Sequence, residues 1–346
     1  FCYPNNRTKG HPKRFTFTTY SAWIGRSEGL LGMSVLTVTL NPSIDRTIAL
    51  SSLNVGEINR AQEITLHPGG KGINVSRAAR AFGVDTHALF IGGKLGESWM
   101  SGELDKAKIA HTVISFGDSI RSNMTIVEGD GTVTKINEPG PTLGKSELEH
   151  IKESLAKLPL DGNWVVFAGR LNPGLSSDAY AELATFAKAR GAKVAVDTSG
   201  EEFASAVKAG AVDLVKPNHH ELSELVGRPL ETISDVIAAA QEVIAGGVST
   251  ILCSMGADGA LLITADGATH CEPIEKVSGT PVGAGDILLG IFIAAGCDVA
   301  ALEAAIAWSA ASVPLPGTSI PSSAQAEAVK VRTRDDFDRA RVLVEA

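Results

Sequence analysis

The stretch from Thr280 to Phe292, TPVGAGDILLGIF, places two glycines and an aspartate directly before an apolar run with helical spacing. Glycines let backbone amides close around an anion, which the positive end of a helix dipole stabilises. A carboxylate at the same place repels a phosphate unless a reacting group lies between them. Asp286 could therefore accept the proton of a hydroxyl that attacks phosphorus, or it could simply cap the helix. This pattern alone leaves both roles open.

An α/β scaffold must position these residues, because short β-rich runs alternate with amphipathic helical stretches from Val35 onward. The clearest predicted strands are VLTVTL, HALFIG, NWVVFAG, KVAVD, VDLVKPN and TILCSMG, at residues 35–40, 87–92, 163–169, 193–197, 212–218 and 250–256. The alternation predicts a mostly parallel sheet with helices on both faces. Ligands of such sheets bind outside the carboxyl ends of the strands.

Two regions, about 46–66 and 110–137, break this alternation with shorter and more polar strand-like runs. The second region contains TVISF and NMTIVEGDGTVTKI, with a hairpin signal at Asp130 and Gly131. We expect a small β element attached to the main sheet. It could be a lid over a cleft, an edge for dimerisation, or both.

Residues 1–32 are expected to be an extension that lies outside the fold. They carry five basic residues and one acidic residue, and they lack the continuous apolar core of a secretory signal. They end just before Met33 and the first predicted strand. We therefore expect a single domain over residues 33–346.

Composition excludes several classes of function. The formal net charge of -8 argues against nucleic-acid binding, because nucleic-acid-binding proteins usually gather basic residues to neutralise phosphates. No apolar run approaches the roughly 18 residues that a membrane span needs, so no membrane association is expected. The four cysteines are scattered without the spacing of a zinc site, which is typical of reduced thiols in a cytoplasmic protein.

The familiar nucleotide-binding motifs do not explain the glycine-rich loops. TLHPGGKGINVS fails as a Walker A loop because Thr65 occupies the first glycine position and Gly72 follows the lysine. GAGDILLG fails as a dinucleotide fingerprint because Leu288 stands where the third glycine should be. The signatures of protein kinases are absent as well.

The ordered set of motifs nevertheless resembles the PfkB group of carbohydrate kinases, in the ribokinase-like family, over nearly all of residues 34–320. The motifs are TLNPSIDRT, GGKGINVSRAAR, KINEPGP, AGRLNPG, KPNHHEL, SMGADGA, GAGD and PLPGTSIP. GGKGINVSRA and KINEPGP are most similar to the phosphosugar branch, 1-phosphofructokinase and tagatose-6-phosphate kinase. The resemblance implies an α/β fold, a ribokinase-like doubly wound sheet flanked by helices, with a small β-strand lid.

The resemblance implies that Asp286 is the catalytic base. The amides of Gly283, Ala284, Gly285 and Asp286 would form an anion hole for the charge in transfer. The sugar-phosphate substrate would be bound by Asp45, Gly69, Gly70, Lys71, Asn74, Arg121 and Asn123.

Within this substrate site, Asp45 would accept bonds from sugar hydroxyls. Lys71 and Arg121 would hold the phosphate that the substrate already carries. Asn41 could belong to the same pocket. Plainer roles remain open for these residues, namely a turn aspartate, an exposed lysine at a helix start and a solvated arginine on a strand.

The nucleotide site implied by the resemblance comprises Lys216, Ser254, Gly256 and Gly259, together with Gly283 and Gly285. Asn218 and Glu221 would organise Mg²⁺ near the nucleotide phosphates through water. Their spacing of three residues also fits a helix capping box, and one structure could serve both roles.

Two positions depart from the family pattern. Arg170 stands where many relatives have a small serine, and Pro281 stands in a segment, TPV, where relatives often carry N-T-x. The guanidinium of Arg170 could add a phosphate contact or crowd the sugar. Pro281 removes one amide and stiffens the approach to the GAGD loop.

We expect an ATP- and Mg²⁺-dependent kinase that converts fructose 1-phosphate to fructose 1,6-bisphosphate. Tagatose 6-phosphate or fructose 6-phosphate is the alternative acceptor, and a homodimer through the β lid is a further expectation. The alternative from another class is a sugar-phosphate sensor without catalysis, which Arg170 and Pro281 favour. The intact Asp286, Asn218 and Glu221 oppose it.

Overall fold

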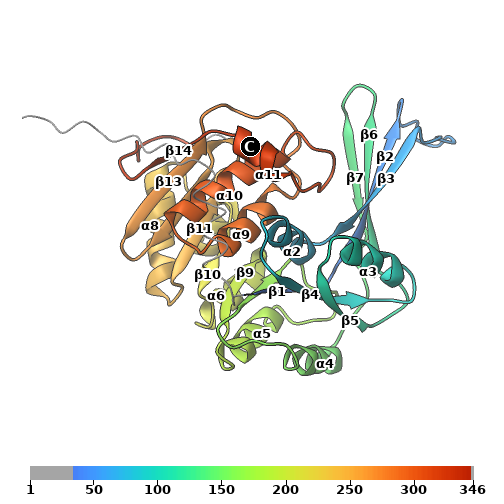
Figure 1. Cartoon of the computed structure of the whole chain (residues 1–346), viewed down its shortest axis with the longest axis horizontal. Helices are drawn as coiled ribbons and strands as arrows, with labels where there is room; N and C mark the ends of the chain where they lie inside the picture. Colours follow the sequence, from blue (N-terminus) through green and yellow to red (C-terminus); the bar gives the residue numbers. More distant parts are fainter. Residues whose placement is uncertain (1–33, 344–346) are drawn as a thin grey trace, which may run out of the picture.

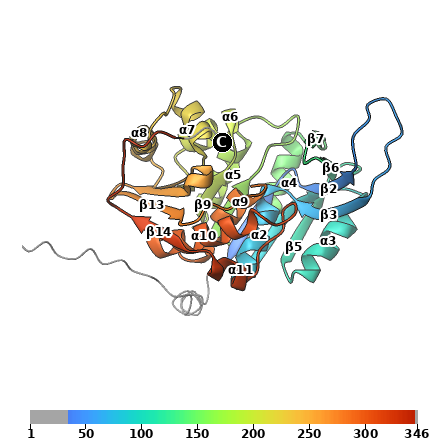
Figure 2. The same ribbon diagram turned by 90° about the horizontal axis from the view of Figure 1, so that it is seen from above.

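The computed structural model describes residues 34–343, so the extension expected at residues 1–32 lies outside the described residues. A ten-stranded sheet with helices on both faces forms the body of the molecule, and a separate four-stranded sheet projects from one end (Figure 1). Figure 2 shows this small sheet at the opposite end of the molecule from strands β13 and β14. The predicted α/β, doubly wound fold is confirmed.

The large sheet contains every strand that the clearest sequence runs predict. In spatial order its strands are β14 (Val331–Arg334), β13 (Gly267–Pro273), β12 (Ala260–Thr264), β11 (Thr250–Ser254), β10 (Leu214–Val215), β9 (Lys193–Asp197), β8 (Trp164–Ala168), β1 (Val35–Thr39), β4 (Thr86–Gly92) and β5 (Ala110–Ser115). The strands from β11 to β5 pair in parallel, whereas β12, β13 and β14 add antiparallel strands at one edge. Because both faces are covered, β1 is buried along its whole length.

Helices cover the two faces of this sheet in two groups. The first group packs over one face and comprises α4 (Lys145–Leu155), α5 (Ala179–Lys188), α6 (Gly200–Lys208), α7 (His219–Val226) and α8 (Ile233–Ala245). The other face carries α2 (Lys71–Ala81), α9 (Ala284–Ala294), α10 (Val299–Ser312) and α11 (Ser323–Ala328), while α3 (Glu97–Lys106) packs near β4. Within residues 34–343, no helix has the length and apolar character to cross a bilayer.

The small sheet is the expected lid, built from β3 (Glu63–Gly69), β2 (Ser43–Leu50), β6 (Arg121–Glu128) and β7 (Val133–Asn137) in that spatial order. The predicted hairpin joins β6 to β7, with Gly131 in the left-handed region at φ 90°.

The expected second lid segment, 110–137, is wrong at its start. Residues 110–115 form β5, which pairs in parallel with β4 at the edge of the large sheet. An edge strand is covered less than a central one, so its sequence is as polar as that of a lid strand. The described second lid segment therefore begins at Arg121.

Candidate active site

The predicted site residues gather at the carboxyl ends of β11, β10, β9, β8 and β1, which are consecutive neighbours in the large sheet. Helices α2 and α9 begin at the same edge and pack side by side (Figure 1). Their close approach requires glycine at position 290, because a Cβ there would lie 2.7 Å from the carbonyl oxygen of Val75 and 2.9 Å from the Cβ of Ala78. This packing brings residues 212 positions apart into contact, where Asn74 Nδ2 donates to Asp286 Oδ2 at 2.9 Å.

Asp286 has the environment of a base that works near neutral pH. Its side chain lies in the first turn of α9, and the residue is only 7% exposed. Burial, and then the nearby carboxylate of Asp197, raise the pKa of Asp286 to about 6, although Lys71 and the bond from Asn74 oppose the rise. At pH 7 the carboxylate is mostly ionised, and it is a stronger proton acceptor than an ordinary aspartate.

Asp197 joins two lysines beside this base. Lys71 Nζ donates to Asp197 Oδ1 at 2.8 Å, and Lys216 Nζ lies 3.4 Å from Asp197 Oδ2. Burial disfavours the charge on Asp197, but the two ammonium groups outweigh it and hold the pKa of Asp197 below its usual value. Burial likewise opposes the charge on Lys71, yet Asp197 and Asp286 raise the pKa of Lys71. Lys71 therefore carries a fixed positive charge at the reacting end of the site, and Lys216 lies beside the same carboxylate.

Sequence reasoning missed Asp197. The available signal was an acidic residue at the carboxyl end of the predicted strand KVAVD, where parallel sheets place ligand-binding groups. The same reasoning assigned Lys71 to the substrate's own phosphate, whereas the structure pairs its ammonium group with Asp197.

The start of α9 offers fewer free amides than expected. The N–H of Ala284 donates to the carbonyl of Pro281 at 3.2 Å, and the N–H of Asp286 donates to the carbonyl of Gly283 at 3.1 Å. Among the residues that the structure describes, the N–H groups of Gly283 and Gly285 have no acceptor. A Cβ on Gly285 would lie 3.3 Å from Lys216 Nζ, so this lysine stands beside the free amide. Two amides and one ammonium group together form an anion site.

The root of the lid forms a polar cradle around Asp45. Ser43 Oγ and Asn123 Nδ2 donate to Asp45 Oδ1 at 2.7 Å and 3.1 Å. Burial raises the pKa of Asp45, and these two bonds oppose that rise. Three buried oxygens near this cradle have no partner in the described chain: Thr39 Oγ1, Asn41 Oδ1 and Asn123 Oδ1. Buried acceptors of this kind suit the hydroxyl groups of a sugar.

The side chain of Asn41 connects the cradle to two further motifs. Its Nδ2 donates to the carbonyls of Pro139 at 2.9 Å and Leu171 at 3.3 Å. Arg121 Nε donates to the carbonyl of Asn41 at 3.2 Å, and Arg121 Nη1 donates to the carbonyl of Glu138 at 3.0 Å. The motifs NPSID, KINEPGP and AGRLNPG therefore meet at one place, and Arg121 lies there too.

Gly69→Ala should raise the KM for the sugar substrate by about 10-fold or more, with a smaller effect on kcat. A Cβ at position 69 would lie 2.3 to 2.5 Å from the carboxylate atoms of Asp45, so this carboxylate must move. The matched control is Gly102→Ala in α3, where a Cβ meets nothing within 4 Å. Steady-state kinetics of both variants tests the placement of Asp45, and equal KM values would contradict it.

The predicted nucleotide residues lie at the end of β11. Ser254 forms an isolated bridge with Asn218, and its N–H donates to the carbonyl of Pro217 at 3.0 Å. A short 3₁₀ turn, η2 (Gly256–Asp258), follows, and Gly259 then approaches the backbone so closely that a Cβ would lie 2.0 Å from the carbonyl of Cys271. These glycines fold the chain back and leave a backbone-lined turn just after Ser254, which pairs with Asn218.

Asn218 and Glu221 form the capping box of α7. Asn218 Oδ1 accepts from the N–H of Glu221, and Glu221 Oε2 accepts from the N–H of Asn218, both at 2.8 Å. No group of three or more His, Cys, Asp or Glu side chains within residues 34–343 is arranged to hold a metal ion. This donor set fits Mg²⁺ held by nucleotide phosphates and water, with a protein carboxylate nearby, better than a cage of protein ligands.

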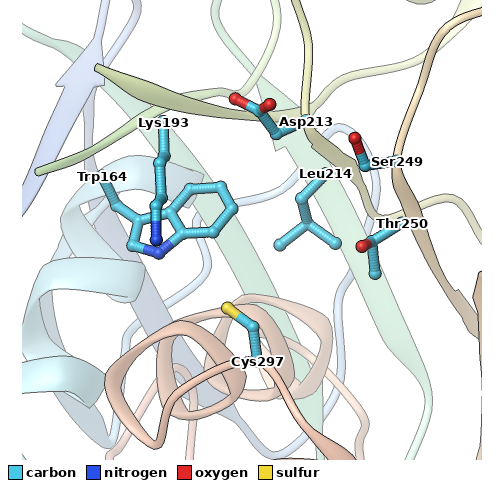
Figure 3. Close-up of a pocket in the computed structure, with 7 residues that line it drawn as sticks. All are labelled: Trp164, Lys193, Asp213, Leu214, Ser249, Thr250 and Cys297. Atoms are coloured by element: carbon cyan, nitrogen blue, oxygen red, sulfur yellow. The ribbon is translucent and has the colours of Figure 1, made fainter. Parts of the chain in front are cut away.

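A separate cavity of about 230 Å³ lies at the amino ends of strands β8 to β11, whereas the predicted site residues lie at the carboxyl ends (Figure 3). It is lined by Trp164, Lys193, Asp213, Leu214, Ser249, Thr250 and Cys297. None of the predicted site residues lines it, so the convergence around Asp286 and Asp45 identifies the candidate active site.

Comparisons with known proteins show which family the chain resembles over most of its length. The family model described as "pfkB family carbohydrate kinase" matches residues 38–324. The chain is 37% identical over 274 residues to 1-phosphofructokinase of Xanthomonas campestris, which covers 78% of this chain and 86% of that protein. It is 32% identical over 261 residues to tagatose-6-phosphate kinase of Staphylococcus epidermidis, covering 73% and 82% of the two chains. Phosphofructokinase-2 from Escherichia coli, solved in complex with potassium, superposes with a TM-score of 0.81 at 28% identity, covering 86% of this chain and 98% of that one.

Proposed function

Because this chain belongs to the pfkB family of carbohydrate kinases, we propose that it transfers the γ-phosphoryl group of ATP to a ketohexose phosphate, with fructose 1-phosphate as the preferred acceptor. The product is then fructose 1,6-bisphosphate. The observation that carries the proposal is the buried carboxylate of Asp286, which lies beside the Lys71–Asp197–Lys216 cluster and faces the same edge of the sheet as the cradle around Asp45.

In this reaction Asp286 accepts the proton of the free primary hydroxyl of the sugar while the hydroxyl oxygen attacks the γ-phosphorus in line. The oxygen–phosphorus bond to ADP breaks as the new bond forms. The amides of Gly283 and Gly285 and the ammonium groups of Lys71 and Lys216 stabilise the charge on the transferred group. Bound Mg²⁺ would neutralise charge on the nucleotide phosphates, with Asn218 and Glu221 holding it through water.

The acceptor is oriented by the polar cradle at the root of the lid. Asp45 and Asn123 are paired across β2 and β6, and each keeps an oxygen available for sugar hydroxyls. Ser254, Gly256 and Gly259 form the turn that faces the nucleotide. Gly70, which begins α2 with φ at 110°, brings the backbone beneath the sugar.

The test is an ADP-release assay with fructose 1-phosphate, tagatose 6-phosphate and fructose 6-phosphate as acceptors. We expect the highest kcat/KM with fructose 1-phosphate. A higher value with either other sugar would contradict the proposed preference and keep the kinase activity. Calorimetric binding of a sugar phosphate without turnover of any of the three would favour the sensor without catalysis.

One reason for the sensor alternative is weakened by the position of Pro281. Its carbonyl accepts the N–H of Ala284 and helps to begin α9, so a proline at this position is compatible with the turn that starts the helix. The bond from Asn74 to Asp286 remains in place behind it.

We also propose that the outer face of the lid binds a second copy of the chain. Strand register places Asp45, Asn123 and His67 in one row, and the adjacent row on the opposite face contains Leu66, Arg46, Met124 and Ile136. On this outer face Ile64 is 53% exposed, Leu66 38% and Ile136 49%. An exposed apolar sheet face of this kind is typical of an interface between proteins.

Ile64→Lys should convert the dimer to a monomer, because it places a charge in the apolar face of the lid. Glu63→Lys is the matched control, since its side chain lies on the opposite face of the same strand and is exposed. Light scattering measures the mass of each variant in solution. A wild-type chain that is monomeric at micromolar concentration would refute this interface.

We also propose that the protein is located in the cytoplasm. Cys253, Cys271 and Cys297 are free thiols in the structure, which is the state that reducing compartments maintain. Cell fractionation tests it.

A further inference from the structure

Arg77 is a partly buried arginine of α2 that contacts the residue bonded to Asp286. Its Nη1 donates to Asn74 Oδ1 at 3.1 Å and to the carbonyl of Thr318 at 2.9 Å, with longer contacts to the carbonyl of Pro68 and the hydroxyl of Thr318. Across residues 34–343, no carboxylate forms an ion pair with Arg77. The hydrogen bonds of this guanidinium therefore go to neutral oxygen atoms.

These contacts fix which way the side-chain amide of Asn74 points. A guanidinium carries only donors, so Asn74 must turn its oxygen towards Arg77, and its NH2 group is left to donate to Asp286 Oδ2 at 2.9 Å. In the opposite orientation the NH2 group would face the donors of Arg77, and the amide oxygen would face a carboxylate. Asn74 is only 4% exposed, so water has little access to replace either bond.

Thr318 connects the same arginine to the start of α9. It lies in the loop after α10 and is buried. A Cβ on Gly283, the residue before α9, would lie 3.4 Å from Thr318 Cγ2 and 3.5 Å from Thr318 Cβ, so the side chain of Thr318 packs against this turn. Arg77 thus joins two segments that both contact the first turn of α9, where Asp286 lies.

We propose that Arg77 is a positioning residue, which holds the amide of Asn74 against the carboxylate of Asp286 and links both to the loop at Thr318. This proposal rests on the proposed kinase function, in which Asp286 is the base. Without the guanidinium, the amide of Asn74 can rotate, and the carboxylate loses its fixed donor for part of the time. The base is then less well aligned with the hydroxyl that it deprotonates.

The loss of this donor has a defined electrostatic sign. Burial and the carboxylate of Asp197 raise the pKa of Asp286 to about 6, whereas Lys71, the hydrogen bond from Asn74 and Lys216 oppose the rise. A variant without the hydrogen bond should therefore have a higher pKa at Asp286. Because only the ionised carboxylate accepts a proton, the kcat of this variant should fall at a higher pH than the kcat of the wild-type chain.

Arg77→Met should lower kcat by about 10-fold and raise the midpoint of the fall in kcat at low pH by about 0.5 pH unit or more, the effect of losing one hydrogen bond to a carboxylate. The KM values for ATP and for the sugar phosphate should stay within about threefold of the wild-type values. Arg77→Lys keeps a donor and should show a smaller change in the same direction. The midpoint does not depend on the folded fraction of the sample, so it separates a positioning role from a loss of stability.

Arg80→Met is the matched control, because Arg80 lies one turn further along α2 and pairs with the exposed Asp85. Its midpoint should equal that of the wild-type chain. In an Asn74→Ala background, Arg77→Met should leave the midpoint unchanged, because the residue through which Arg77 acts is already absent. A shift of the same size in both backgrounds would overturn the proposal, since the charge of Arg77 would then act on Asp286 directly. An unshifted midpoint in Arg77→Met alone would overturn it as well.

An NMR titration of the carboxyl groups separates this proposal from the kinase function itself. The full chain is labelled with ¹³C at the aspartate carboxyl carbons, and the resonance of Asp286 is identified as the one missing in Asp286→Asn. If the wild-type chain turns over no sugar phosphate in the ADP-release assay, the kinase function fails. A higher pKa of Asp286 in Arg77→Met than in the wild-type chain would then still support the role of Arg77, and equal pKa values would overturn it.

Discussion

Asp286→Asn should lower kcat by at least about 100-fold, the usual contribution of a general base. Asparagine has nearly the same shape, and its carbonyl oxygen can still accept the bond that Asn74 donates to Asp286 Oδ2. The variant loses proton acceptance and keeps the packing of α9 against α2. Steady-state kinetics should therefore show a KM for ATP within about threefold of the wild-type value, while circular dichroism shows an unchanged fold.

The pH dependence of kcat tests the same role of Asp286 independently. Burial raises the pKa of Asp286 to about 6, and only the ionised carboxylate accepts a proton. The wild-type kcat should be highest above pH 6 and fall as the pH drops through this value. This fall in kcat at low pH is the acidic limb of the pH profile, and the residual kcat of Asp286→Asn should lack it. A variant with near-normal rate at pH 7 would refute the assigned base.

Lys71→Met should lower kcat by about 100-fold or more, because it removes a fixed positive charge from the transferred group. It should also move the acidic limb of the pH profile to higher pH, since Lys71 lowers the pKa of Asp286 in the wild-type chain. Lys71→Arg keeps the charge and should preserve part of the rate and most of the position of this limb. Kinetics from pH 5 to 8 measures both effects.

Lys188→Met is the control for Lys71→Met, because Lys188 also pairs with an aspartate, Asp213, but does so at the other edge of the sheet. Its kinetics should match the wild type. If Lys71→Met instead raises the KM for the sugar phosphate and leaves kcat unchanged, Lys71 contacts the substrate's own phosphate, as the sequence first indicated.

The sequence predicted the fold well because its strongest signals are local. Buried parallel strands read as continuous apolar runs, and VLTVTL and NWVVFAG become the neighbouring inner strands β1 and β8. The misplaced strand is β5, for which the local pattern has no distinguishing feature. An edge strand of a large sheet and a strand of a small lid are both partly exposed, so their sequences are equally polar.

The candidate site was predicted as a set of motifs, and its internal pairing was not. Asp197 was not predicted because a lone acidic residue at a strand end belongs to no glycine-rich motif. Its importance comes from its contacts with Lys71 and Lys216, which the sequence does not show. The number of free amides at the start of α9 depends on the turn geometry at Pro281, which spacing does not encode. Long-range contacts of this kind are decided by tertiary packing.

The contact at Gly290 extends the structural requirements of the active site beyond the residues that perform chemistry. This glycine lies one turn along α9 from Asp286 and touches Val75 and Ala78 on α2. Any larger side chain there would push the two helices apart and separate Asn74 from the carboxylate of Asp286 that it orients. The alignment of the catalytic base thus depends on the absence of a side chain at a buried position that takes no part in the proton transfer.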